Sequence, residues 1–347
     1  MKAAMYDQFQ SEIEIRKVED PTPQNEGVVI ELKSSGLCLS DWHGWMGHDK
    51  DIQLPHVPGH ELAGVITAIG SDVKNFKVGA RVTVPFVSGC GKCVECQTGN
   101  HQICDNQFQP GFTHWGSFAQ FVSIHYADTN LVKLPEEMEF TTAASLGCRF
   151  ATSFRGVVDQ GKVSEDQWVA VHGCGGVGLS AIMIAKAYGA KVVAVDISEE
   201  ALDFAKSIGA AATVNTHTSA DVPAEINEQT DGGAHLSVDA LGNPDILLNS
   251  LNSLRKRGKH IQIGIMPPQH TLSKIPIDKI IARELEILGS HGMQAYRYEE
   301  MLALIKDGKL HPEKLIAEEV RLEDVVHELP AMNRSTSAGI KVITDFG

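Results

Sequence analysis

The sequence is poor in basic side chains for its size. Its 347 residues contain 30 Lys and Arg against 44 Asp and Glu, which gives a formal net charge of −14 at pH 7. Because nucleic acids and anionic membranes bind basic surfaces, this balance argues against either as the main partner. The opening segment MKAAMYDQFQSE also lacks the apolar core of a secretory signal, so we expect a cytoplasmic protein.

A hydrophobic run suited to a membrane span is absent as well. Residues 167–185 carry no Asp, Glu, Lys or Arg, but four glycines stand near the centre of this stretch, next to His172. Glycines placed in this way are typical of a strand, a turn and a helix in a globular protein. There is no internal repeat or low-complexity tract, and the length allows about two domains.

The first 150 residues contain short β-like runs separated by glycine, proline and polar turns. Runs of this kind are 28–33, 62–69 and 80–86. They are rich in β-branched residues or alternate in part, which predicts a compact, mostly antiparallel β domain with irregular loops.

From about residue 151, strand patterns alternate with helix patterns. We expect strands at 168–172, 191–196, 212–215, 235–241, 259–265 and 285–290, and helices at 179–188, 199–208 and 246–256. Such alternation predicts a doubly wound parallel sheet covered on both faces. The last strand-like segment, 339–346, returns to the first pattern. We therefore expect an α/β chain in which a Rossmann domain, 151–285, is inserted into a mostly β catalytic domain, 1–150 and 286–347.

A glycine-rich turn follows the first strand of the α/β region. The segment GCGGVG fits G-x-G-x-x-G, with Gly173, Gly175 and Gly178 in the three glycine places, and Asp196 ends the next strand. These glycines permit the turn, the approach of a pyrophosphate and close packing of helix on strand. A carboxylate at Asp196 suits the adenosine ribose and repels a 2′-phosphate, so the motif predicts NAD rather than NADP. The alternative is a glycine turn that only packs.

Four of the seven cysteines lie within fifteen positions: Cys90, Cys93, Cys96 and Cys104. The odd total and the missing secretory segment disfavour a disulfide framework. Four thiolates around Zn²⁺ form a closed tetrahedral site, so the spacing predicts a structural zinc lobe. An iron–sulfur cluster, which also takes four cysteines, and inert buried cysteines are the alternatives.

A second metal site is indicated by residues that lie far apart. Two cysteines and a histidine, with water as the fourth ligand, form a catalytic zinc site. Cys38 and His60 are candidates for two of these ligands, and Cys148, just before the α/β region, is the candidate third. Spacing alone leaves open that all three belong to the core.

Taken together, these segments resemble the zinc-dependent medium-chain alcohol dehydrogenase family. The Cys38 to His43 segment, the Gly59-His60-Glu61 triplet, the four-cysteine lobe, Cys148 and the glycine turn occur in the family's order over essentially the whole chain. The resemblance implies a GroES-like catalytic domain and two zinc ions per chain. It also implies NAD as cofactor and an alcohol or aldehyde as substrate. A cysteine at 148 resembles the alcohol-type branch, since polyol-type relatives tend to carry glutamate there.

The resemblance also assigns roles to individual residues. It implies a catalytic zinc held by Cys38, His60 and Cys148, with Glu61 close beneath the metal and Asp41 supporting His60. The residues it implies at the cofactor are Thr152, Gly173, Gly175, Gly176, Val177, Gly178 and Asp196.

The implied reaction is the reversible, NAD-dependent oxidation of primary or secondary alcohols to aldehydes or ketones. Zinc polarises the oxygen and the cofactor takes a hydride. Ser40 is implied to take the alcohol proton, the nicotinamide ribose to pass it on, and His43 to deliver it to solvent. Considered without the resemblance, Ser40 could be a turn residue and His43 a surface imidazole. Similarity to short bacterial members implies a homotetramer, with a dimer as the alternative.

Some positions depart from the family or leave the substrate open. Leu39 stands where many relatives carry a basic residue or histidine facing the pyrophosphate, and Arg149 beside Cys148 is unusual. Residues that could line a pocket near the zinc, or equally pack in the core, are Trp42, Trp45, Met46, Phe112 and Trp115. The alternatives in function are a same-fold dehydrogenase for a polyol, an amino alcohol or a formaldehyde adduct, and a non-catalytic zinc- and nucleotide-binding sensor.

Overall fold

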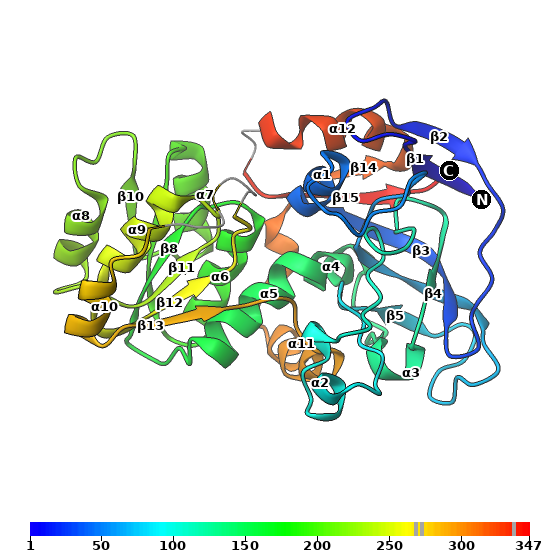
Figure 1. Cartoon of the computed structure of the whole chain (residues 1–347), viewed down its shortest axis with the longest axis horizontal. Helices are drawn as coiled ribbons and strands as arrows, with labels where there is room; N and C mark the ends of the chain where they lie inside the picture. Colours follow the sequence, from blue (N-terminus) through cyan, green and yellow to red (C-terminus); the bar gives the residue numbers. More distant parts are fainter. Residues whose placement is uncertain (267–269, 271–273, 335–337) are drawn as a thin grey trace.

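The computed structural model places most strands in two large sheets at opposite ends of the molecule (Figure 1). It describes residues 1–266, 270, 274–334 and 338–347. The middle of the chain forms a six-stranded sheet, and the first and last parts together form a seven-stranded sheet. A two-stranded sheet, β1 (Lys2–Met5) and β2 (Glu14–Lys17), lies at the same end as the seven-stranded one. The expected insertion of an α/β unit into a mostly β unit is therefore confirmed.

All neighbouring strands of the six-stranded sheet run parallel, in the order β10-β9-β8-β11-β12-β13. The strands are β8 (Trp168–His172), β9 (Lys191–Asp196), β10 (Ala212–Asn215), β11 (Ala234–Asp239), β12 (Leu254–Gln262) and β13 (Glu286–Gly289). This is the doubly wound order in which the winding reverses between the first and fourth strands, here β8 and β11. Ligands of such sheets bind outside the carboxyl ends of the strands at that reversal.

Helices on both sides of these strands complete the α/β unit (Figure 1). They are α6 (Gly176–Ala187), α7 (Glu199–Ile208), α8 (Val222–Gln229), α9 (Pro244–Asn252) and α10 (Ile277–Arg283). Three of them begin at capping side chains: Ser198 accepts a hydrogen bond from the Ala201 N–H at 3.3 Å, Asp221 accepts one from Ala224 at 3.0 Å, and Asn243 accepts one from Asp245 at 2.8 Å.

The seven-stranded sheet joins the two ends of the chain. Its strands are β3 (Val28–Leu37), β4 (Glu61–Ile69), β5 (Arg81–Thr83), β6 (Phe121–Ile124), β7 (Val132–Lys133), β14 (Ile316–Arg321) and β15 (Ile340–Asp345). Every pairing is antiparallel except β14 with β15. The last strand, β15, pairs with β3, as the return of the β pattern near the end predicts.

Short helices surround this sheet and connect the two units. They are α1 (Leu39–Trp45), α2 (Val94–Gln97), α3 (Ala127–Asn130), α4 (Phe140–Ser145), α5 (Ala151–Phe154), α11 (Tyr298–Lys306) and α12 (Val325–Ala331). Two π-helical turns, η2 (Leu146–Phe150) and η3 (Arg155–Gln160), extend α4 and α5. Short 3₁₀ turns are η1 (His101–Ile103), η5 (Ala295–Arg297), η6 (Pro312–Leu315), η7 (Leu322–Asp324) and η8 (Met332–Arg334).

Several element boundaries differ from those expected. The helix expected at 246–256 ends at Asn252, and β12 already begins at Leu254, because the Ala234 N–H binds the Ser253 carbonyl and the chain joins the sheet there. Helix α6 begins at Gly176 rather than 179, because the glycine turn itself enters the helix. Strand β13 pairs with β12. Because β13 lies beyond the expected boundary at 285, we propose that the inserted unit ends after Gly289.

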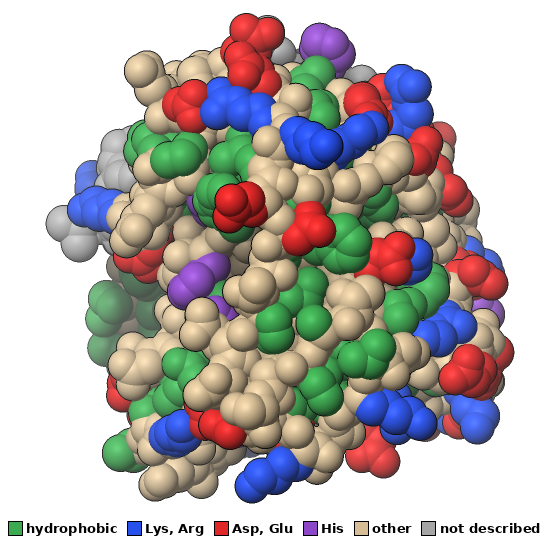
Figure 2. All heavy atoms as spheres, turned by 90° about the vertical axis from the view of Figure 1, so that its right-hand side faces the viewer, with side chains coloured by type: hydrophobic (Ala, Val, Ile, Leu, Met, Phe, Trp, Pro, Cys, Tyr) green, Lys and Arg blue, Asp and Glu red, His purple; other side chains and the backbone are tan. Residues whose placement is uncertain are grey.

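The face shown in Figure 2 carries acidic and basic side chains side by side, and no continuous basic patch is visible among its described residues. Among the described residues, no helix combines the length and apolar character that crossing a membrane requires.

Candidate metal centres and cofactor cleft

The seven-stranded sheet brings Cys38 and His60 together. Strands β3 and β4 pair antiparallel, with Gly36 opposite Glu61. Cys38 follows the end of β3 and precedes helix α1, while His60 directly precedes β4. Two residues 22 positions apart in the sequence therefore become neighbours through strand register.

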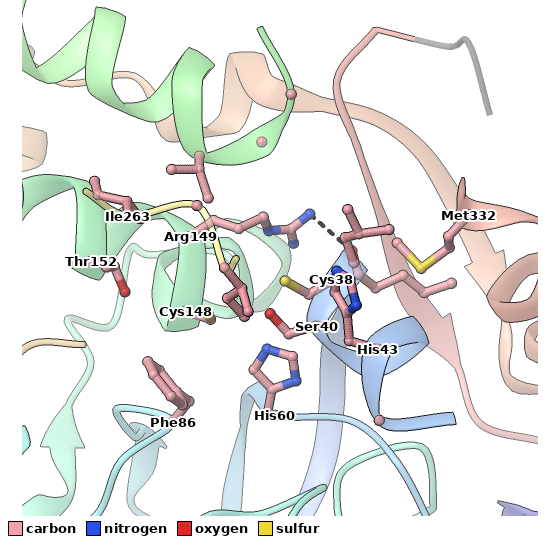
Figure 3. A pocket seen from close by; sticks show the side chains of 18 of the residues that line it. Cys38, Ser40, His43, His60, Phe86, Cys148, Arg149, Thr152, Ile263 and Met332 are labelled. Carbon is pink, nitrogen blue, oxygen red and sulfur yellow. Dashed lines mark hydrogen bonds between the residues drawn. The ribbon is translucent and has the colours of Figure 1, made fainter. Parts of the chain in front are cut away.

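Cys148 reaches the same place from the helical connection between the two units. It lies on η2, and π-helical turns of this kind often mark functional sites. The two sulfurs and one ring nitrogen of Cys38, His60 and Cys148 all lie within 4.8 Å of one another. Figure 3 shows these side chains grouped around one space, with the Ser40 hydroxyl beside them. The three expected ligands are therefore brought together.

The hydrogen bonds of His60 fit a metal ligand. Its Nδ1 lies 2.7 Å from Asp41 Oδ1, and because a carboxylate only accepts, Nδ1 carries the proton in the neutral ring. The free lone pair is then on Nε2, which is buried and has no hydrogen-bond partner among the described residues. Asp41 also accepts from the backbone N–H of Gly59 and Cys38 at 3.0 and 3.1 Å. A carboxylate that orients a ligating histidine is common at metal sites, and a donor set of two thiols and an imidazole suits Zn²⁺.

Glu61 and Arg149 form a buried ion pair next to this cluster. Arg149 Nε lies 3.1 Å from Glu61 Oε1, and Nη2 binds Oε2. Burial raises the pKa of the Glu61 carboxyl, and the charge of Arg149 opposes that rise. Burial alone would lower the pKa of the Arg149 guanidinium, but the charges of Glu61 and Cys38 outweigh it and raise that pKa. The unusual arginine is therefore the counter-ion of Glu61.

The residues of the second cluster all come from one short segment of the chain. The sulfurs of Cys90, Cys93, Cys96 and Cys104 also lie within 4.8 Å of one another. Backbone N–H groups of Cys90 and Asn106 donate to Cys104 Sγ, each at 3.2 Å. Amides of Lys92 and Cys93 donate to Cys90 Sγ, each at 3.4 Å. Four sulfurs at this spacing, with amides donating to two of them, fit a closed tetrahedral metal site.

A cavity of about 850 Å³ joins the first cluster to the α/β unit. Predicted site residues that line it are Cys38, Ser40, His43, His60, Cys148, Thr152, Gly175, Gly176 and Val177. The hydroxyl of Thr152 is buried without a hydrogen-bond partner among the described residues. Gly173, Gly178, Asp196 and Glu61 are not among the residues that line the cavity.

The glycine turn has the shape that a dinucleotide requires. Gly173 has φ +96°, in the left-handed region, and a Cβ on Gly178 would overlap the Gly173 carbonyl oxygen. A Cβ on Gly175 would meet no atom within 4 Å, which leaves an open cradle at the start of α6. Asp196 accepts from the backbone N–H of Cys174 at 2.6 Å and of Ser198 at 2.9 Å, so its carboxylate holds the turn. An open cradle at a helix N-terminus fits a pyrophosphate.

The two residues expected to move a proton lie on α1. Ser40 and His43 both line the cavity, and His43 Nδ1 lies 2.9 Å from Nδ1 of the exposed His48. Burial, and then the neighbouring His48, lower the pKa of His43. The neutral form of His43 is thus favoured, which is the form that accepts a proton.

Of the aromatic and methionine candidates for the pocket, only Phe112 lines the cavity. Trp42 and Trp45 pack against the core of the β unit, and Trp115 is 40% exposed. Residues of the lining that the sequence analysis did not single out include Phe86, Ile263, His291 and Met332. Phe86, Ile263 and His291 lie outside the helices and strands, and Met332 begins the turn η8. Only the mutual position of the two units reveals them.

Family models match both parts of the chain. The model described as alcohol dehydrogenase GroES-like domain matches residues 24–136, and the model described as zinc-binding dehydrogenase matches residues 176–307. An alcohol dehydrogenase of Geobacillus stearothermophilus is 33% identical over 328 residues, 94% of each chain.

Solved structures agree with the fold. Benzyl alcohol dehydrogenase from Acinetobacter calcoaceticus has a TM-score of 0.91 and 26% identity, covering 99% of each chain. A structure titled as a short chain alcohol dehydrogenase from Escherichia coli CFT073, in complex with NADH, has a TM-score of 0.89 and 26% identity, covering 99% of each chain. The order of motifs, the two sheets and these matches together place the chain in the zinc-dependent medium-chain alcohol dehydrogenase family.

Proposed function

We propose that the chain is an NAD-dependent dehydrogenase that interconverts primary or secondary alcohols with aldehydes or ketones. The observation that supports this most directly is that one cavity is lined by both sets of residues. Cys38, His60 and Cys148 line it together with Thr152 and with Gly175, Gly176 and Val177 of the glycine turn. The three candidate metal ligands and the cradle for a dinucleotide thus face the same space. Hydride transfer between an alcohol and a nicotinamide requires this arrangement.

Two zinc ions per chain are part of the proposal. Cys38, His60 and Cys148 would hold a zinc with an open position, and the four clustered cysteines would hold a structural zinc. The first ion would supply a Lewis acid for the alcohol or carbonyl oxygen, and NAD would supply the hydride acceptor.

The chain's own residues supply orientation and proton transfer. Ser40 accepts the alcohol proton at the cavity wall, and His43 carries it toward the surface, where His48 is exposed. Asp196 supports the choice of NAD, because a carboxylate at the end of β9 repels a 2′-phosphate and Ile197 and Ser198 supply no cation.

The test is a kinetic panel on the purified protein with metal analysis of the same sample. Primary, secondary and aryl alcohols are offered with NAD or NADP, and the absorbance of the reduced nicotinamide is followed. We expect two zinc ions per chain, turnover of at least one class of simple alcohol, and preference for NAD. One zinc ion and no turnover of any alcohol or aldehyde would instead favour a non-catalytic sensor.

Polyols, amino alcohols and formaldehyde adducts belong in the same panel. A kcat/KM for any of these that exceeds the values for all simple alcohols would replace the proposed substrate class but keep the proposed chemistry. Preference for NADP would overturn only the role proposed for Asp196 and would leave the proposed chemistry in place.

A further inference from the structure

Arg149 is one of the most buried cationic side chains of the molecule. It is 6% exposed, and its partner Glu61 is fully buried. Besides the two contacts with Glu61, its Nη1 donates to the Leu37 carbonyl at 2.9 Å. An arginine taken out of water needs such complete pairing, because an unpaired buried charge is strongly destabilising. Because burying this charge costs folding free energy, its presence here points to a role beyond packing.

The partners of Arg149 stand in a specific relation to the metal cluster. Leu37 precedes Cys38, Glu61 follows His60, and Arg149 itself follows Cys148. The guanidinium therefore bonds to residues next to two of the three ligands, and its own residue follows the third.

Glu61 also links the His60 segment to the Cys148 segment through the backbone. Its Oε1 accepts from the backbone N–H groups of Cys148 and Arg149, both at 2.9 Å. The carboxylate on the His60 segment thus fixes the backbone of the Cys148 segment directly. Strand β3, strand β4 and turn η2 are held together at the points where their ligands emerge.

The ion pair also touches the cofactor turn. A Cβ on Gly176, the first residue of α6, would lie 2.5 Å from Arg149 Cδ. A Cβ on Gly36 would overlap Glu61 Oε2 and lie 2.9 Å from Arg149 Nη2. Glycines at these two places leave the room that the pair occupies, and the arginine stem packs directly against the start of α6.

We infer that Arg149 is a positioning residue that sets the arrangement of the three catalytic-metal ligands and seats the dinucleotide turn against them. It acts through its bonds to Glu61 and the Leu37 carbonyl, and its side chain also lines the cavity. The inference rests on the proposed function, since it assumes that Cys38, His60 and Cys148 hold a metal.

The test separates this role from simple charge burial. Arg149→Met leaves Glu61 unpaired, so the informative protein is the double variant Arg149→Met/Glu61→Gln. In it, methionine fills the space of the arginine stem, and the glutamine oxygen can still accept the two backbone N–H bonds. The matched control is Arg297→Met/Asp159→Asn, which removes a partly buried bidentate pair away from the cavity, with contacts of 2.7 and 3.3 Å.

Zinc affinity is measured by competition with a chromophoric chelator, NAD binding by calorimetry on protein stripped of the weaker zinc, and folding by circular dichroism. For the Arg149 double variant we expect affinity for one zinc to fall about 10–100-fold, as is typical when groups that orient ligands are lost. The other zinc serves as an internal standard and stays bound. NAD affinity should weaken by about threefold or more, and the control should change neither quantity.

The variant Arg149→Lys provides a second test of the inference. Lysine keeps the charge but has no planar fork for Glu61 and Leu37 together. We expect zinc affinity between those of the native protein and the double variant. A folded double variant that keeps native affinity for both zinc ions would overturn the inference. A native protein that binds only one zinc would overturn the proposed function instead.

Discussion

The two cysteine clusters differ in how the chain assembles them. Cys90, Cys93, Cys96 and Cys104 come from one segment of fifteen residues. Cys38, His60 and Cys148 come from three segments, and 88 residues separate the last two. The first cluster is a local loop that closes on itself, whereas the second exists only once two strands and a helical turn have met.

What supports each cluster differs as well. Around the four-cysteine cluster, the apolar packing consists of the cysteines themselves and the partly buried Tyr126. The dispersed cluster instead stands against the large cores and is held by Asp41 and by the Glu61–Arg149 pair. We propose that the local cluster would need a metal to stay folded, whereas the dispersed cluster is held by the fold and would use a metal for chemistry.

Cys148→Ala is the most severe test of this contrast. Loss of one ligand should remove the Lewis acid, and several kcal/mol of lost stabilisation correspond to about a 10³-fold or larger fall in kcat/KM. Because the surrounding fold carries the site, the apparent Tm should change by no more than about 3 °C. Alcohol kinetics and thermal unfolding of the same preparation check both parts. A variant that unfolds far below the native Tm would show that this metal also supports the fold.

Cys104→Ala should give the reverse result. Breaking the closed site removes part of the energy that folds the lobe, so we expect the apparent Tm to fall by roughly 5–10 °C. The kcat of the molecules that remain folded should stay within about threefold of native, because the cavity does not include the lobe cysteines. Thermal unfolding is compared with Cys174→Ala, which removes a buried cysteine outside both clusters. Equal Tm values for the two variants would contradict a structural role for the lobe.

The same contrast explains how far the sequence could predict the molecule. Strands β8 and β9 and the four-cysteine lobe follow from local pattern, because their contacts lie close along the chain or repeat with a fixed period. Cys148 could be named from its place in the sequence as the candidate third ligand, but spacing alone leaves open that it belongs to the core, and only the family resemblance favours a ligand. The role of Arg149 could not be predicted at all, because its partners Leu37 and Glu61 are brought to it by strand register.

The smallest expected effect lies where the chain departs from its family. Leu39 is 44% exposed, begins helix α1 and lines the cavity. If the cofactor's pyrophosphate lies at this end of the cavity, Leu39→Arg adds a charge-assisted hydrogen bond worth about 1 kcal/mol, or about a fivefold lower KM for NAD. Val78→Arg is the matched control, since it adds the same charge at an exposed site outside the cavity. A lower KM in both variants would assign the effect to net charge. Unchanged or weaker NAD binding in Leu39→Arg alone would mean that the pyrophosphate does not lie beside α1. Helix α1, which follows the candidate metal ligand Cys38, would then take no part in holding the cofactor that the dinucleotide turn binds.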